Sequence, residues 1–157
     1  MFYGEYEASL DAKNRVAFPA PFRNRLEPAE RERLVLTPMP DGCIALYTLA
    51  EWQRLEREVA EASGTVLGTA QARDFERALY SRAADVDIDK QGRILLPERL
   101  RKEGGLRKDV VFVGVRNRVE IWDRARWEAG EPKRARTFRK VAERTQTRAG
   151  ADRGALG

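Results

Sequence analysis

Alternating hydrophobic and polar positions near the N-terminus predict two short β-strands. Apolar side chains recur at Tyr6, Ala8 and Leu10, with polar residues mostly between them. After a short polar segment the alternation resumes at Val16 and Phe18. Because successive side chains of a strand point to opposite faces, this pattern predicts strands with one buried face.

The same alternation returns in the second half of the chain. Val86 and Ile88 alternate with acidic residues, and Ile94 and Leu96 continue the pattern. Residues 85, 87 and 89 are all aspartate. Acids at alternate positions are typical of the solvent side of a strand, so we do not interpret them as a cation site.

A proline ends the strand pattern in each half, at Pro19 and Pro97. Proline donates no ladder hydrogen bond but is accepted in the first turn of a helix. The segment ERLRKE at 98–103 is therefore predicted to be a short helix that two glycines stop. Phe22 and Leu26, four residues apart, predict the corresponding helix in the first half.

Two longer amphipathic helices are predicted between the halves, separated by a break at 63–68 (SGTVLG). Such helices usually pack their apolar face against a neighbouring element, and a coiled coil would need longer heptads. The apolar positions are Leu49, Trp52, Leu55, Val59 and Ala62 in the first helix, and Ala72, Phe75 and Leu79 in the second.

The chain contains an internal repeat, DAKNRVAFPAPFR at 11–23 and DKQGRILLPERLR at 89–101. The similarity resumes downstream, where LVLTP matches VVFVG and IALYTLAEW matches VEIWDRARW. Each copy is predicted to run strand, turn, strand, short helix, strand, strand, short helix. The identical pairs are Asp11 with Asp89, Arg15 with Arg93, Pro19 with Pro97, and Arg23 with Arg101.

Three residues separate the repeated aspartate from the repeated arginine in both copies. A three-residue hairpin loop commonly ends with one residue in the left-handed region, and Asn14 and Gly92 suit that position. Aspartate and arginine are then expected to face each other at the base of each loop as a cross-strand ion pair. Lys13 and Lys90 are expected at the outward tips.

These tips have two interpretations. Lysine neutralises phosphate, and arginine can form a fork onto guanine in the major groove, so Arg15 and Arg93 are candidate DNA contacts. The alternative is a salt bridge that closes the turn and needs no ligand. Arg23 and Arg101 on the short helices extend the basic surface, or they are solvated side chains.

The net charge of +5 originates in the C-terminal tail. Residues 131–157 carry eight Lys and Arg against three acids, whereas residues 1–130 carry twenty-two of each. A basic tail suits a polyanionic partner, through counterion release. A solvated, frayed C-terminus is the alternative.

Composition excludes several classes of protein. With 42% hydrophobic and 35% charged residues, we expect a soluble globular protein with no membrane anchor or secretion signal. The single Cys43 is compatible with the cytoplasm. The absence of histidine and of a phosphate-binding loop argues against an enzyme, and neither a cofactor nor a metal is expected.

The two elements DAKNR and DKQGR, each followed by apolar residues and proline, and the N-terminus MFYGEYEASLD resemble the MraZ family of AbrB-type transcription factors. The resemblance covers about residues 1–145. It implies a mixed α+β, β-rich fold in which two tandem AbrB-like swapped-hairpin β-barrel halves form an intrachain pseudo-dimer with short helices. The expected parts are a first unit at 1–52, a helical connection at 53–82, a second unit at 83–128 and the basic tail at 129–157.

The resemblance also implies a nucleoid-associated repressor that binds double-stranded DNA. Its operator would be direct repeats upstream of the operon for cell division and cell-wall synthesis, and the protein would form ring-shaped homo-oligomers. An AbrB-type antitoxin or protein-interaction module is the alternative. In the second turn, Gln91 and Gly92 offer fewer donors than their counterparts. The expected DNA contacts are Lys13, Asn14 and Arg15, then Lys90, Gln91 and Arg93, with Arg23 and Arg101 beside them.

Overall fold

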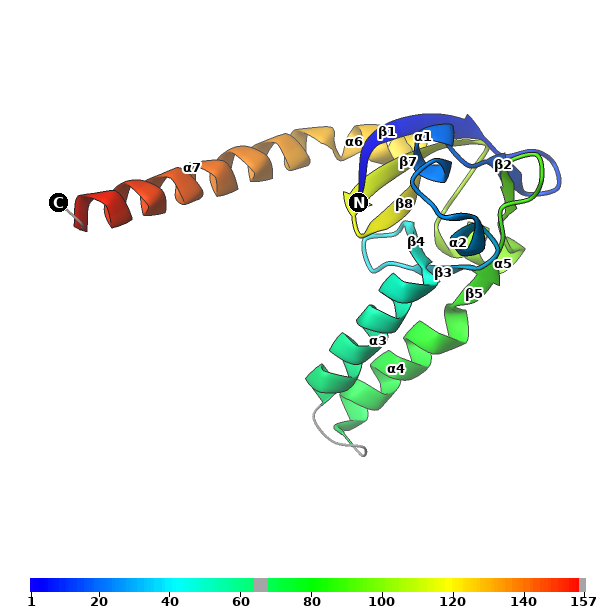
Figure 1. Ribbon diagram of the computed structural model, residues 1–157, viewed down its shortest axis with the longest axis horizontal. Coiled ribbons are helices and arrows are strands. Elements are labelled where there is room, and N and C mark those ends of the chain that lie inside the picture. The colour runs from blue at the N-terminus through cyan, green and yellow to red at the C-terminus, as the bar shows by residue number, and fades with distance from the viewer. Residues whose placement is uncertain (64–67, 156–157) are drawn as a thin grey trace. The chain divides into compact units, whose positions relative to one another are not determined.

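The computed structural model describes residues 1–63 and 68–155 and contains two compact units, residues 1–124 and 125–157. Most of the predicted break at 63–68 and the last two residues of the tail lie outside the described residues. The strands of the first unit are β1 (Phe2–Ser9), β2 (Arg15–Ala17), β3 (Leu34–Pro38), β4 (Ile44–Thr48), β5 (Ala84–Val86), β6 (Arg93–Leu95), β7 (Asp109–Arg116) and β8 (Arg118–Asp123) (Figure 1). Its helices are α1 (Ala20–Arg23), α2 (Pro28–Arg31), α3 (Leu49–Ser63), α4 (Ala70–Arg82) and α5 (Glu98–Glu103).

The strands form an antiparallel six-stranded sheet with the order β1-β7-β8-β4-β3-β5 and a separate two-stranded ribbon of β2 and β6. The mixed α+β fold class is therefore confirmed. The β-barrel expected for each half is not found: among the described residues β1 and β5 are the two edges of an open sheet. Strands from both copies of the repeat share that sheet, so neither copy has a sheet of its own to close.

Strand pairing follows the internal repeat. Val16 pairs with Ile94, its equivalent in the second copy. The sheet order is symmetric about the β4–β8 pair, because β3 and β7 flank that pair and β5 and β1 lie at the edges. The two copies are therefore related by an approximate two-fold axis in their pairing. On either side of the Val16–Ile94 pair, Arg15 pairs with Leu95 and Ala17 pairs with Arg93. The two-fold symmetry makes these two pairs equivalent.

The strands on either side of each repeated turn do not pair with each other, so the prediction of a local hairpin is wrong. β1 pairs with β7 along its whole length, whereas β2, after the turn, pairs with β6. Each turn thus connects the sheet to the ribbon. The strand after the turn finds its partner in the other copy because Val16 and Ile94, each 1% exposed, are buried together there.

One hydrophobic core serves both copies of the repeat. Phe22 of α1 makes edge-on contacts with Phe2 and Tyr6, with ring centroids 5.8 and 5.1 Å apart. Phe18 connects the copies, because its ring lies 5.7 Å from that of Phe112 in β7. Short helix α5 has the predicted bounds, whereas α1 contains Phe22 but ends at Arg23, before Leu26. Each helix buries one side chain in this core.

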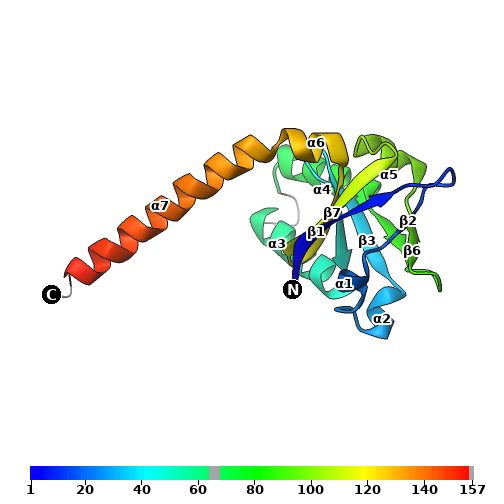
Figure 2. The same cartoon turned by 90° about the horizontal axis from the view of Figure 1, so that it is seen from above.

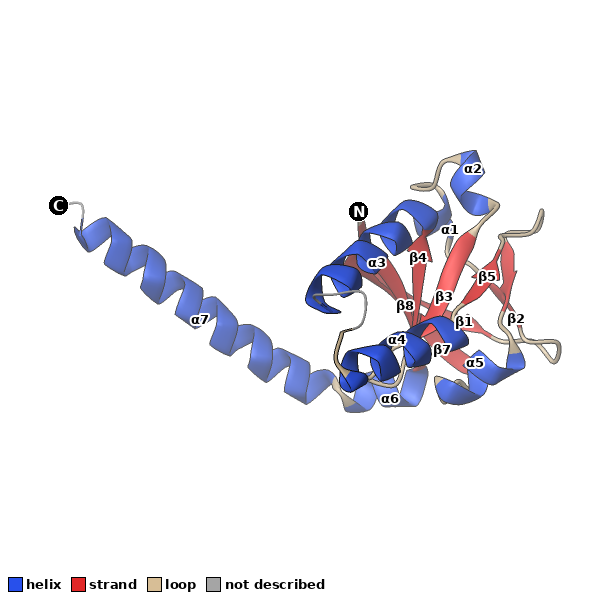
Figure 3. Cartoon of the chain, turned by 90° about the horizontal axis from the view of Figure 1, so that it is seen from below, coloured by secondary structure: helices blue, strands red, loops and turns tan. Residues whose placement is uncertain are grey.

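Helices α3 and α4 lie side by side over β4 and β3, on the sheet face opposite this core (Figure 3). Trp52 packs between Tyr47 of β4 and Tyr80 of α4, with centroids 6.1 and 5.9 Å away. The predicted packing of both helices against a neighbouring element is confirmed for Trp52, Leu55 and Leu79. Phe75, by contrast, is 54% exposed.

The second unit is helical, with α6 (Arg124–Ala129), whose first residue ends the first unit, and α7 (Glu131–Ala155). The guanidinium of Arg134 lies 3.4 Å from the ring centroid of Trp127 and donates to the Trp127 carbonyl at 2.6 Å. Within the basic tail, α7 is a continuous helix from Glu131 to Ala155.

We predict that Gly114→Ala destabilises the first unit by about 1–3 kcal/mol, the usual effect of overpacking. Gly114 pairs with Gly4 between β7 and β1, and a Cβ at Gly114 would overlap backbone atoms of Phe2 and Tyr3. Thermal denaturation measures the destabilisation. Gly150→Ala in α7, where a Cβ meets nothing within 4 Å, is the control and should leave the transition unchanged. A Gly114→Ala transition at the wild-type temperature would contradict this packing.

Candidate nucleic-acid interface

The ribbon of β2 and β6 has a buried face and an open face. Val16 and Ile94 point into the core, and Arg15, Ala17, Arg93 and Leu95 alternate with them on the outer side. The loops leading into β2 and β6 protrude at the same end of the first unit (Figure 2). The structure therefore brings the two repeated turns and the two arginines onto one surface.

The aspartate at the start of each turn fixes its backbone. Oδ1 of Asp11 accepts hydrogen bonds from the backbone N–H groups of Lys13 and Arg15, both at 2.9 Å. The N–H of Asn14 donates to the Asp11 carbonyl at 3.1 Å, and Asn14 has φ 61°. This is the predicted three-residue turn with a left-handed residue in third place.

The second turn repeats this arrangement. Oδ1 of Asp89 accepts from the backbone N–H groups of Gln91 and Arg93 at 2.8 and 2.9 Å. Gly92 takes the left-handed position with φ 77°. Both turns are then hydrogen-bonded to the opposite strand, because Phe18 N–H donates to the Gly92 carbonyl and Leu96 N–H donates to the Asn14 carbonyl, each at 2.9 Å.

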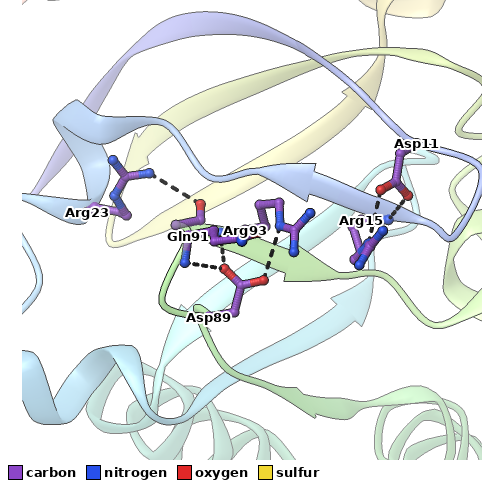
Figure 4. A network of polar contacts seen from close by, with 7 residues as sticks. Asp11, Arg15, Arg23, Asp89, Gln91 and Arg93 are labelled. Atoms are coloured by element: carbon purple, nitrogen blue, oxygen red, sulfur yellow. Dashed lines mark hydrogen bonds and ion pairs between the residues drawn. The ribbon is translucent and has the colours of Figure 1, made fainter.

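The predicted ion pairs are present at the base of both turns (Figure 4). Arg15 Nε lies 3.0 Å from Asp11 Oδ2, and Arg93 Nε lies 3.2 Å from Asp89 Oδ2. Backbone N–H donation by the following arginine, more than the ion pair itself, lowers the pKa of both aspartates. Among the described residues, both guanidinium groups hydrogen-bond through Nε alone, which leaves their outer Nη groups for a ligand.

The two turns differ in the hydrogen bond that their third residue forms with the rest of the protein. Asn14 Nδ2 donates to Glu98 Oε2 at 2.6 Å, whereas Gly92, its equivalent, offers only its carbonyl, which accepts from Arg23 Nη1 at 3.2 Å. The same Nη1 donates to the Phe18 carbonyl at 2.7 Å. A side chain at Gly92 would collide with the Arg23 guanidinium.

Arg23 and Arg101 are half-buried and use their donors inside the protein. Arg101 forms a two-pronged pair with the Glu98 carboxylate at 3.1 and 2.9 Å and also donates to the Leu106 carbonyl. Hydrogen bonds from Arg101 and Asn14 lower the pKa of Glu98 to about 2. A direct DNA contact by Arg23 or Arg101 stays a prediction, and these bonds indicate that both side chains support the turns.

The predicted tip residues Lys13, Lys90 and Gln91 are exposed, and Asn14 is half-buried. A hollow of about 250 Å³ lies beside the second turn. Arg31 lines this hollow and donates to the Leu26 carbonyl. The sequence repeat did not predict Arg31 as a site residue, because it lies outside the repeated motif. Among the described residues, no acidic or cysteine cluster could hold a metal ion.

Helix α7 presents a second basic surface, within the second unit. Five exposed cationic residues recur every three or four positions and therefore share one helical face. Glu143 lies at the edge of this face, and the opposite face includes Ala135, Phe138, Ala142 and Ala149. We call this set the α7 basic stripe: Lys133, Arg136, Lys140, Arg144 and Arg148.

We predict that Glu98→Gln makes the protein less sensitive to acid. The folded pKa of about 2 lies below the ordinary value of 4.5, so the stabilisation by Glu98 is complete above pH 4.5 and is lost as the pH falls towards 2. The melting temperature should therefore fall more steeply between pH 5 and pH 2 in the wild type than in Glu98→Gln. If the melting temperatures of the two proteins fell in parallel with pH, the hydrogen bonds of Glu98 to Asn14 and Arg101 would not stabilise the protein in solution.

The chain matches known proteins along most of its length. The sequence model of the MraZ protein family, described as antitoxin-like, matches residues 1–77 and 79–149. The chain is 45% identical to the transcriptional regulator MraZ of Acetivibrio thermocellus, over 82% of this chain and 85% of that protein. It is 42% identical to that of Heliobacterium modesticaldum, over 92% and 96%, and 43% identical to that of Lactobacillus delbrueckii subsp. bulgaricus, over 91% and 95%. The chain therefore belongs to the MraZ family, whose curated relatives are named transcriptional regulators and not enzymes.

Proposed function

We propose that this protein is a DNA-binding regulator that reads the major groove with the β2–β6 ribbon and its two turns. The observation that carries the proposal is a pair of arginines on an open two-stranded ribbon, each held at Nε by an aspartate, with no hydrogen bond from its Nη groups among the described residues. The major groove admits a two-stranded ribbon, and a guanidinium can donate to O6 and N7 of guanine together.

In this proposal, different residues of the turns contact different parts of the DNA. Lys13 and Lys90 are exposed point charges and contact phosphates, which sets the register of the protein on the duplex. Arg15 and Arg93 contact base edges. Asn14 and Gln91 add hydrogen bonds, and Gly92, the equivalent of Asn14, has no side-chain donor. Arg23 and Arg101 hold the turns in place.

We further propose the swapped-hairpin arrangement and the direct-repeat operator that the family resemblance implies. A chain with its own internal two-fold symmetry needs no second copy to complete its sheet. Further association is then head-to-tail, and head-to-tail contacts that close form a ring. Identical subunits of a ring present their turns in one recurring orientation, which matches direct repeats in the DNA. The regulatory role in this proposal is repression of the cell division and cell-wall operon at the nucleoid.

The α7 basic stripe adds affinity without sequence preference in this proposal. Lysine and arginine along one side of a helix meet phosphates, whose neutralisation releases counterions. The opposite face has Ala135, Phe138, Ala142, Thr145 and Ala149 at heptad spacing. Phe138 alone among these is a large apolar residue, so the face buries too little surface for a stable coiled coil with a second copy. Among the described residues no helix has the length and apolar character needed to cross a bilayer.

An AbrB-type antitoxin or protein-interaction module is the second candidate, and the antitoxin-like description of the matched family favours keeping it. A regulator shifts labelled DNA at moderate salt without any added protein, and a module that only masks a protein partner does not. Sequencing of genomic fragments retained by the purified protein would then identify the operator.

We predict that Arg15→Ala weakens binding to the retained fragments by about 5- to 150-fold per site, equivalent to about 1–3 kcal/mol for one bidentate contact. The fold should persist, because the side chain is 35% exposed and surface ion pairs contribute little. Arg77→Ala, which removes an exposed arginine paired with Asp74 on α4, is the matched control. Unchanged affinity, or a variant that simply unfolds, would favour a structural salt bridge.

We predict that deleting the residues after Pro132 flattens the salt dependence of DNA binding, by about 0.9 in the double-logarithmic slope for each phosphate that the tail no longer neutralises. Discrimination between specific and scrambled duplexes should remain. A rearranged variant tests the geometry of the stripe: exchanging Arg136 with Ala135, Lys140 with Ala142 and Arg144 with Thr145 keeps composition and charge but moves three cations to the other face. A wild-type slope in this variant would mean that net charge alone matters.

A further inference from the structure

Leu95 is an exposed leucine on the candidate DNA-reading surface. The residue is 57% exposed, whereas Arg15 and Arg93 beside it are half-buried. Leu95 pairs directly with Arg15 across the ribbon, and Arg93 precedes it by two residues on the same face of β6. A large exposed apolar group therefore lies next to both arginines on the open face of the ribbon.

Packing within the protein does not account for this leucine. The buried face of the ribbon is formed by Val16 and Ile94, which point the other way. The equivalent position in the first copy is Ala17, also exposed, so the ribbon forms equally well with a methyl group there. The leucine side chain leaves a substantial apolar area in water that a bound partner could cover.

The chemistry of the major groove supplies one matching apolar group. The edges of the base pairs present hydrogen-bond donors and acceptors, and thymine alone adds a C5-methyl group. A leucine that enters the groove beside two guanine-reading arginines can lie against that methyl group, whereas an alanine is too short to bury as much surface.

We propose that Leu95 is a specificity-determining residue that contacts the C5-methyl group of a thymine in the bound DNA. The inference rests on the proposed function, because it requires the ribbon to lie in the major groove. It has a structural consequence: the two halves of the ribbon read different bases, with Leu95 selecting thymine in one half and Ala17 making no such selection in the other.

Replacing thymine with uracil tests the proposal, since it removes the methyl group and nothing else. The probe is a 30-base-pair duplex selected by the wild-type protein from a random pool and synthesised with deoxyuridine at each thymine position in turn. For the wild type, uracil at one position should weaken binding about four-fold, the effect expected from one buried methyl group. Leu95→Ala should bind the thymine and uracil forms equally.

Two further variants keep the experiment interpretable. Leu95→Ser is a second truncation, in case the alanine variant folds poorly, and it should also lose the discrimination. Phe138→Ala removes an apolar side chain that is 75% exposed on α7 and should keep the wild-type ratio.

The outcomes separate the inference from the function on which it rests. Failure to enrich any sequence from the pool would overturn the proposed function, and the role of Leu95 with it. Enrichment with no position sensitive to uracil would overturn the role of Leu95 alone. Discrimination that survives in both truncated variants would also overturn it, since another side chain would then contact the methyl group.

Discussion

Pairing between the two copies of the repeat underlies every other feature of the candidate interface. β2 and β6 are three residues long, and an isolated ribbon of that length is not stable in water. It persists here because Val16 and Ile94 are buried in a core to which both copies contribute, with Phe18 in contact with Phe112. The candidate interface therefore exists only once residues far apart in the chain have folded together.

The repeated aspartate couples this pairing to the proposed chemistry. One carboxylate accepts from two backbone N–H groups of its turn with Oδ1 and from the arginine Nε with Oδ2. The bonds that shape the turn thus also orient the guanidinium group. A side chain held in this way loses less conformational freedom on binding than a free arginine, which favours a precise contact with a base edge.

Approximate symmetry does not make the two halves of the surface identical. Asn14 is held by Glu98, whereas the equivalent Gly92 is held through its carbonyl by Arg23. Leu95 protrudes where the first copy has Ala17. Duplication within one chain allows such differences, because each copy has its own side chains, and the two turns of one chain are therefore unequal.

The repeat, the two turns with their left-handed third residues, the Asp–Arg pairs and the helices α3, α4 and α5 could be predicted from the sequence, because each shows in a local residue pattern. Helices α2 and α7 were not predicted. The strand pairing could not. Alternation at Val16 and Ile94 indicates a buried face but not its partner, so the flanking strands were expected to form local hairpins, and they pair with the other copy instead. The internal bonds of Arg23 and Arg101 and the exposure of Leu95 follow from that long-range pairing, and no local pattern carries them.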